Sequence, residues 1–153
     1  MEELDQPHPL SAAVAVATLK RYLPYDEHRI RLHDLVMQEV KSLRMRITET
    51  VPSVHATIGR EGEVYVCAVK QLDKLSETVM SLMVTGLYWG TSNQMNLWYR
   101  ALERLGSTSV SDIGGGYMQW YDLLKYPALL ALYAGGMGVL AADNEDALVR
   151  FPI

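Results

Sequence analysis

Apolar residues recur every three or four positions along two stretches of the chain, which is the repeat of one face of an α-helix. The first stretch holds Leu32, Val36, Val40, Leu43 and Ile47, and the second holds Ala68, Leu72, Leu75, Val79, Leu82 and Gly86. We therefore expect one helix from Asp26 to about Thr48 and a longer, central helix from about Glu63 to Tyr88. Their apolar stripes should be buried against each other.

Capping and helix-breaking residues delimit two more helices in the first two thirds of the chain. Leu10 to Leu23 reads as a helix that ends before Pro24, because proline disfavours helical backbone in the residue that precedes it. Thr91 and Gln94 have the spacing of a capping box, in which each side chain bonds the other's backbone. A helix is expected to follow that box.

Proline and aspartate divide the C-terminal third. Pro127 suits the first position of a helix, where its missing N–H costs nothing. We expect a short aromatic helix from Tyr117 to Lys125 and a separate helix from Pro127 to about Ala142. Asp143 is the expected N-cap of a last helix.

The remaining segments are expected to be irregular. Residues 1–9 read as a disordered leader, Thr50 to Gly62 as a connector, and Gly106 to Gly116 as a loop rich in serine and glycine. The fold class predicted is all-α, a helical bundle or short α-solenoid-like array of about six helices. Residues 10–153 are expected to form a single helical domain, which is compatible with a piece of a longer protein.

Composition fits an ordinary globular domain and argues against nucleic acid and anionic membrane surfaces as partners. Hydrophobic residues make up 49% of the 153 residues and charged residues 21%. The formal net charge of -4 does not favour nucleic acid or an anionic membrane surface. The chain begins with acidic and polar residues and has a single cysteine, so we expect a cytoplasmic protein without disulfides.

The histidines and the cysteine do not form a recognisable metal site. His28 and His33 are five residues apart, which places them on different faces of a helix, and no second cysteine accompanies Cys67. The neighbours of Cys67 are apolar, so we expect a buried, inert thiol. We expect no metal and no cofactor.

No catalytic set is apparent either. Asp112 and Asp122 flank the glycine run Gly114–Gly116, which lacks the lysine and hydroxyl residue of a P-loop. Acid–base catalysis by paired carboxylates needs a fold that brings them together, and solvated charges explain both residues. The sequence therefore favours a non-enzymatic protein.

A run of seventeen uncharged residues, 126–142, is the strongest candidate for an interaction surface. It is longer than one face of a surface helix usually hides, and its glycines permit another helix to approach closely. The chain ends barely two turns after Asp143, so we expect part of this run to be covered by another chain or domain. The expected interface residues are Leu129, Leu132, Tyr133, Gly135, Met137 and Leu140.

Two alternatives remain open. Nine of the thirteen aromatic residues lie between Tyr88 and Tyr133, so a sensor or enzyme could use an aromatic pocket near Tyr117 and Trp120. The candidate pocket residues are Tyr117, Trp120, Tyr121 and Trp98. Residues 126–142 also reach the lower limit of length for a membrane-spanning helix, which makes a membrane-associated protein the second alternative.

The second half of the chain resembles helical regions within large bacterial multidomain proteins. The likeness is carried by the segments 85–90 (TGLYWG), 97–98 (LW), 102–105 (LERL) and 126–136 (YPALLALYAGG). In such proteins a helical segment accompanies an effector or NTPase domain, often in a defence setting. The resemblance implies a scaffold or sensing module whose active domain lies elsewhere, and it assigns no catalytic or binding residue.

Overall fold

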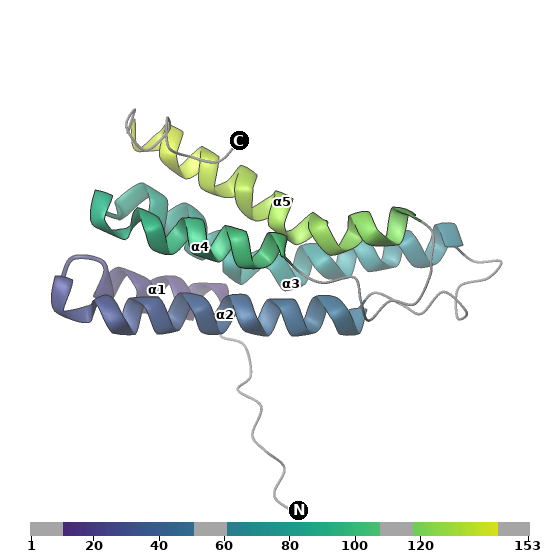
Figure 1. Ribbon diagram of the computed structural model, residues 1–153, viewed down its shortest axis with the longest axis horizontal. Coiled ribbons are helices and arrows are strands. Elements are labelled where there is room, and N and C mark those ends of the chain that lie inside the picture. The colour runs from purple at the N-terminus through teal and green to yellow at the C-terminus, as the bar shows by residue number, and fades with distance from the viewer. Residues whose placement is uncertain (1–10, 51–60, 108–117, 144–153) are drawn as a thin grey trace, which may run out of the picture.

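The computed structural model describes residues 11–50, 61–107 and 118–143, and these residues form α-helices and two short 3-10 turns (Figure 1). The elements are α1 (Ala12–Tyr22), the 3-10 turn η1 (Asp26–His28), α2 (Arg29–Thr50), α3 (Glu61–Trp89), the 3-10 turn η3 (Ser92–Gln94), α4 (Met95–Gly106) and α5 (Met118–Ala141). The all-α prediction is confirmed, and five α-helices are close to the expected six. The leader, most of the connector and glycine loop, and the expected last helix lie outside the described residues.

Local side-chain contacts explain where the helices begin. The Ser11 hydroxyl accepts a hydrogen bond from the Val14 amide at 3.4 Å and caps α1. The predicted capping box is present, with the Thr91 amide donating to Oε1 of Gln94 at 2.9 Å. The Gln94 amide nitrogen Nε2 also donates to the carbonyl of Leu23 at 3.1 Å, so this box ties the start of α4 to the end of α1.

The helix α3 is central, as expected, because it contacts all four of the other α-helices. Figure 1 shows α1 and α2 in one layer, α3 and α4 in the next, and α5 across the top. The contacts of α3 with α5 pair Asp73 with Tyr126 and Val84 with Gly138. Both residue numbers rise together, so α3 and α5 are parallel and α4 returns the chain between them.

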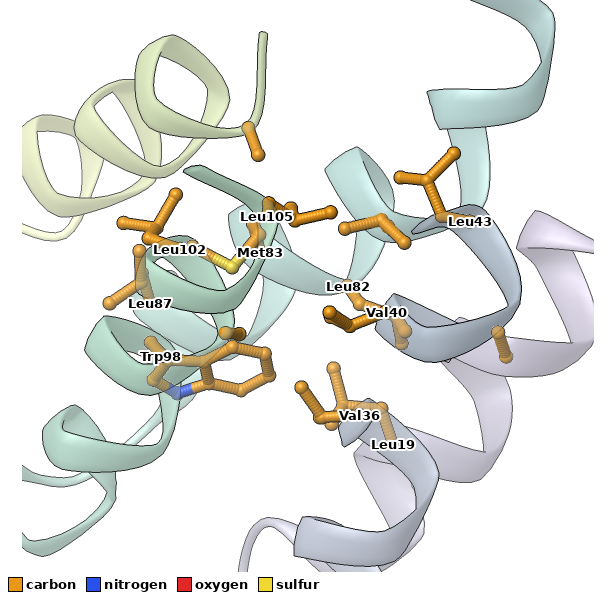
Figure 2. Close-up of a cluster of buried hydrophobic side chains, with 14 of the residues drawn as sticks. Leu19, Val36, Val40, Leu43, Leu82, Met83, Leu87, Trp98, Leu102 and Leu105 are labelled. Atoms are coloured by element: carbon orange, nitrogen blue, oxygen red, sulfur yellow. The ribbon is translucent and has the colours of Figure 1, made fainter. Parts of the chain in front are cut away.

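The predicted stripes meet in one core. Leu32, Val36 and Val40 of α2 are buried together with Leu72, Val79 and Leu82 of α3. Figure 2 shows side chains of α2, α3 and α4 directed toward one another, including Val36, Val40, Leu82, Met83, Trp98 and Leu105. Leu75 is only partly buried at the margin of the cluster, and Ser76 is fully buried in its place, bonding the Leu72 carbonyl at 2.6 Å.

Trp98 of α4 packs directly against Gly86 of α3. The Trp98 side chain is fully buried, and an ideal Cβ at Gly86 would lie 1.8 Å from Cζ2 of the indole. Only glycine therefore leaves room for the indole ring against α3. Gly86, which the sequence places in the apolar stripe of α3, therefore leaves the space that Trp98, the largest fully buried side chain, occupies.

The predicted helix break at Pro127 is wrong, because α5 runs without interruption from Met118 to Ala141. A proline inside a helix removes one backbone hydrogen bond and costs about 3 kcal/mol. Pro127 is buried, and the two residues before it are held by hydrogen bonds to neighbouring helices. Tertiary packing on both sides of the proline therefore outweighs its local preference, and α5 changes direction near its middle (Figure 1).

Asp143 ends α5 and does not have the geometry expected of an N-cap. Its φ is 53°, the left-handed conformation that commonly terminates helices. The Ala142 amide bonds the Gly138 carbonyl at 3.0 Å, and the Asp143 amide bonds the Leu140 carbonyl at 3.1 Å. Aspartate tolerates this backbone better than most residues, which explains the choice of side chain.

Candidate functional site

The outer face of α5 carries four large apolar side chains on successive turns. Leu129 is 47% exposed, Tyr133 67%, Met137 64% and Leu140 62%. Steps of four, four and three residues place them on one side of the helix. We call these four residues the α5 stripe. They are four of the six interface residues predicted from the sequence, and the run 126–142 contains no charged residue that would oppose burial.

The inner face of α5 is built from small residues that bring it close to α3. Ala131 and Gly138 are buried, and an ideal Cβ at Gly138 would lie 2.8 Å from the Val84 carbonyl oxygen. The close helix approach expected of these residues is therefore made within the chain. Gly135, predicted at the interface, is buried, and Leu132 is half-buried.

An open apolar groove of about 1130 Å³ adjoins the stripe. Its walls come from α3, α4 and α5, and Leu129 belongs both to the groove and to the α5 stripe. The apolar and aromatic lining residues are Tyr65, Val69, Tyr99, Leu102, Leu123, Tyr126, Ala128, Leu129 and Leu132. Glu103, Asp122 and Lys125 supply the charged groups of the lining. Together, the stripe and groove form one continuous apolar surface.

Two hydrogen bonds fix α5 beside this groove. The Tyr126 hydroxyl donates to Oδ1 of Asp73 in α3 at 2.6 Å, and Nζ of Lys125 donates to the carbonyl of Gly106 at the end of α4. The hydrogen bond to Asp73, followed by burial and the carboxylate charge, raises the pKa of Tyr126 above its usual value. Consecutive residues of α5 thus attach it to two neighbouring helices.

Of the four residues of the predicted aromatic pocket, the structure describes the side chain of Trp98 alone. Trp98 is fully buried against Gly86 and does not line the groove. Tyr117 and the side chains of Trp120 and Tyr121 lie outside the described part of the structure. The groove instead uses Tyr65, Tyr99 and Tyr126 as its aromatic walls.

The remaining candidates for chemistry are dispersed. Cys67 is exposed, so the expectation of a buried thiol is wrong, because α3 turns its neighbour Ala68 inward instead. Asp122 is exposed at the groove, while Asp112 lies outside the described residues. Within residues 11–50, 61–107 and 118–143, no group of three histidine, cysteine, aspartate or glutamate side chains could hold a metal.

Sequence reasoning missed the groove because its walls come from three helices. Tyr65, Val69 and Asp73 lie four residues apart on α3, and the first two face the groove while the third bonds Tyr126. That spacing was a signal for a second functional face of α3, beside the core stripe. Nothing in the local sequence of α4 pairs Tyr99 with this face.

The apolarity of α5 is also compatible with a membrane by length and composition alone. In the described part of the chain, one helix, Asp122–Ala141, is long and apolar enough to cross a bilayer, with a mean hydropathy of 1.4. The chain itself buries 44% of that segment. A helix in the core of a globular protein has the same properties, so this is weak support for a membrane span.

Comparison with known protein families, with curated proteins and with solved structures finds no match. The surface of α5 and its neighbours must therefore be interpreted from its own chemistry.

Proposed function

We propose that this chain is a non-enzymatic helical module that binds another protein through the α5 stripe. The observation that carries the proposal is the exposure of Leu129, Tyr133, Met137 and Leu140 on successive turns. Large apolar side chains that lie together on a surface are typical of interfaces, and aromatic residues frequently dominate binding energy there. The partner is a protein, either a second copy of this chain or a further domain or subunit.

The resemblance of the second half to helical regions of bacterial multidomain proteins supports an assembly or sensing role. In that role the chain accompanies an effector or NTPase domain in the cytoplasm, in a defence setting. The charge-free run 126–142 supports an apolar helical partner, because it offers no ion pairs by which a charged surface could be selected.

Packing favours this interface over a membrane span. Ala131 is fully buried, and the backbone of α3 at Val84 approaches Gly138 closely. Insertion of α5 into a bilayer would strip this cover from α3, whose own sequence includes Asp73, Lys74 and Glu77. A protein partner can cover the α5 stripe while leaving the inner face of α5 where it is.

Sedimentation velocity over a range of protein concentrations tests self-association. We expect the wild type to associate, and Met137→Glu to shift it toward monomer, because a carboxylate in an apolar contact is strongly unfavourable. Met45→Glu is the matched control, since Met45 is a methionine that is 47% exposed on α2, away from the stripe. A wild type that stays monomeric at every concentration contradicts self-association.

A pull-down with the full-length natural protein tests whether the partner is a different protein subunit. Loss of a specific partner with Met137→Glu but not with Met45→Glu supports the interface. Flotation of the wild type with neutral phosphatidylcholine vesicles, abolished by Met137→Glu, contradicts a protein interface and supports the membrane alternative.

The groove favours a second candidate function, the binding of a small apolar molecule. It is apolar with few charged groups, although its volume slightly exceeds that of usual ligand sites. Fluorescence of the uncharged dye Nile red provides a test. We expect Ala128→Trp, which fills the groove, to abolish a saturable signal that the exposed control Ala13→Trp retains. An equal signal from both variants contradicts a ligand site in the groove.

A further inference from the structure

A second concave site lies at the other end of α4, where α4 and α2 both begin. This cleft has a volume of about 290 Å³. Ile30 is 71% exposed and Leu97 is half-buried, so these two residues supply its accessible apolar surface, with Leu32 buried beneath them. The polar residues that line it are Arg29, His33, Asn93, Gln94 and Arg100. It therefore combines apolar surface with two cationic side chains from different helices.

Within the part of the chain that the structure describes, the charged side chains that line this cleft are arginines. No carboxylate is among its lining residues, although Asp26 and Glu27 precede Arg29 in sequence. Within the described residues, neither the Arg29 nor the Arg100 guanidinium makes a hydrogen bond or ion pair with another residue. His33 contacts Oδ1 of its neighbour Asp34 through Nδ1 at 3.4 Å. Two arginines lining one cleft without acidic partners favour an external anion.

Hydrogen bonds within the chain hold Gln94, one of the residues that line the cleft, in place. Gln94 accepts from the Thr91 amide and donates to the Leu23 carbonyl, so both ends of its side-chain amide are engaged. This holds the start of α4 against the corner between α1 and α2. A cleft of fixed shape loses less conformational entropy on binding than a mobile one.

We propose that this cleft binds a small organic oxyanion, in which a phosphate or carboxylate contacts Arg29 and Arg100 and a compact apolar body lies on Ile30 and Leu97. The guanidinium group matches the geometry of both oxyanions, because its N–H donors bond two oxygens in parallel. The volume of about 290 Å³ accommodates a body of one aromatic ring, since a cavity of about 150 Å³ can hold benzene. This site is separate from the α5 stripe and does not depend on the proposed protein interface.

Titration of the ¹⁵N-labelled chain with phenyl phosphate tests the proposal by chemical-shift changes. We expect saturable shifts at the amides of residues 29–33 and 93–100. Arg29→Gln and Arg100→Gln should each weaken binding about tenfold, the loss expected for one hydrogen bond to a charged group. Arg31→Gln removes the same charge from an exposed position of α2 outside the cleft, and should change the affinity less than about twofold.

Three further probes separate the contribution of the anionic group to binding from that of the apolar body. Benzoate tests the carboxylate in place of the phosphate, and it should shift the same amides. Inorganic phosphate should bind more weakly than phenyl phosphate, because it cannot contact the apolar surface. Benzyl alcohol should produce no comparable shifts, because it lacks the anion.

Four results would overturn the assignment. The first two are a failure of both phenyl phosphate and benzoate to saturate the shifts, and a loss of affinity with Arg31→Gln as large as that with Arg29→Gln or Arg100→Gln. The other two are binding of benzyl alcohol as tight as that of phenyl phosphate, and equal affinity for inorganic phosphate and phenyl phosphate. Circular dichroism of each variant, whose substituted side chain is exposed, verifies that the helices are retained.

Discussion

At the scale of single residues, this fold depends on places where a side chain is absent. Gly86 leaves the space that the Trp98 indole fills, and Gly138 lets the backbone of α3 approach α5. Both glycines lie inside helices, where glycine is less favourable than alanine by about 1 kcal/mol. The packing that they permit must exceed this local cost.

Gly86→Ala should destabilise the protein by about 1–3 kcal/mol, the usual cost of overpacking a core. The added methyl group would lie 1.8 Å from the indole, so either the ring or α3 must move. Thermal or urea unfolding measures the change. Gly62→Ala is the matched control in the same helix, because its Cβ would meet nothing within 4 Å. Equal stability of the two variants would show that Trp98 does not pack on α3 as described.

The hydrogen bond from Tyr126 to Asp73 should make stability fall in alkaline solution. Its raised pKa means that the folded state holds the phenolic proton more tightly than the unfolded chain does. The stabilisation is therefore complete below about pH 10, the ordinary tyrosine value, and is lost as pH rises through the folded pKa. We expect Tyr126→Phe to lower the free energy of unfolding by about 0.5–1.5 kcal/mol at pH 8.

Melting curves of wild type and Tyr126→Phe from pH 8 to pH 11 check this prediction. The difference between them should begin to shrink above about pH 10 and should disappear only above the raised pKa of the folded state. Asp73→Asn keeps an acceptor but removes the charge, so its pH dependence should be weaker. A difference between wild type and Tyr126→Phe that stays constant to pH 11 would rule out this titration.

At the scale of elements, the sequence predicts the helices that have a regular apolar stripe and fails where packing overrides local preference. The stripes of α2 and α3 were found from spacing alone, and the capping box before α4 from two residues. Pro127 was misread as a helix start, because its burial between α5 and its neighbours is not a local property. The exposure of Cys67 was missed because apolar neighbours do not determine which face of α3 turns inward.

The candidate surface was partly predictable for the same reason. The absence of charge from residues 126–142 indicated α5 as the candidate interaction helix, and four of the six named residues are exposed. The other two could not be separated from them by composition, since Gly135 turns inward and Leu132 is half-buried. The groove joins Tyr65 of α3 to Tyr99 of α4, a contact set by tertiary structure.

Leu72→Ala should cost about 2–5 kcal/mol, because Leu72 is fully buried in α3 and truncation leaves a cavity. Val66→Ala is the control in the same helix, since Val66 is 53% exposed and should change stability by less than about 0.5 kcal/mol. Leu75→Ala should fall between them, because Leu75 is partly buried. Chemical unfolding measures all three, and a mild effect of Leu72→Ala would contradict the central position of α3.

At the scale of the whole molecule, α3 is the helix that contacts every other α-helix of the described structure, while α2 and α4 also contact each other directly. It contacts α1 and α2 on one side and α4 and α5 on the other, so α3 cannot be exposed without opening every layer. The helices at the outside, α1 and α5, each have a face that no described element covers. Stability should therefore decrease from the centre of the fold to its outer helices.

Amide hydrogen exchange should show this order. The slowest amides should lie between Leu72 and Leu87, where α3 is buried most continuously, and should exchange only by global unfolding. Amides of α1 and of the last two turns of α5 should exchange faster. Mass spectrometry of labelled peptides can measure the difference, and faster exchange in α3 than in α1 would be incompatible with this architecture.

The parallel arrangement of α3 and α5 has a consequence for synthesis on the ribosome. The partner of Asp73, Tyr126, is synthesised 53 residues later, and Gly138, which contacts Val84, is synthesised 54 residues after it. At about 5–20 residues per second, the ribosome needs roughly 3–10 s to make that length of chain. During this interval α3 has emerged beside α1 and α2, but the side that α5 will cover is bare. The nascent protein therefore presents a long apolar helix to the cell before it can fold, and a molecular chaperone that recognises such helices would meet it at this stage.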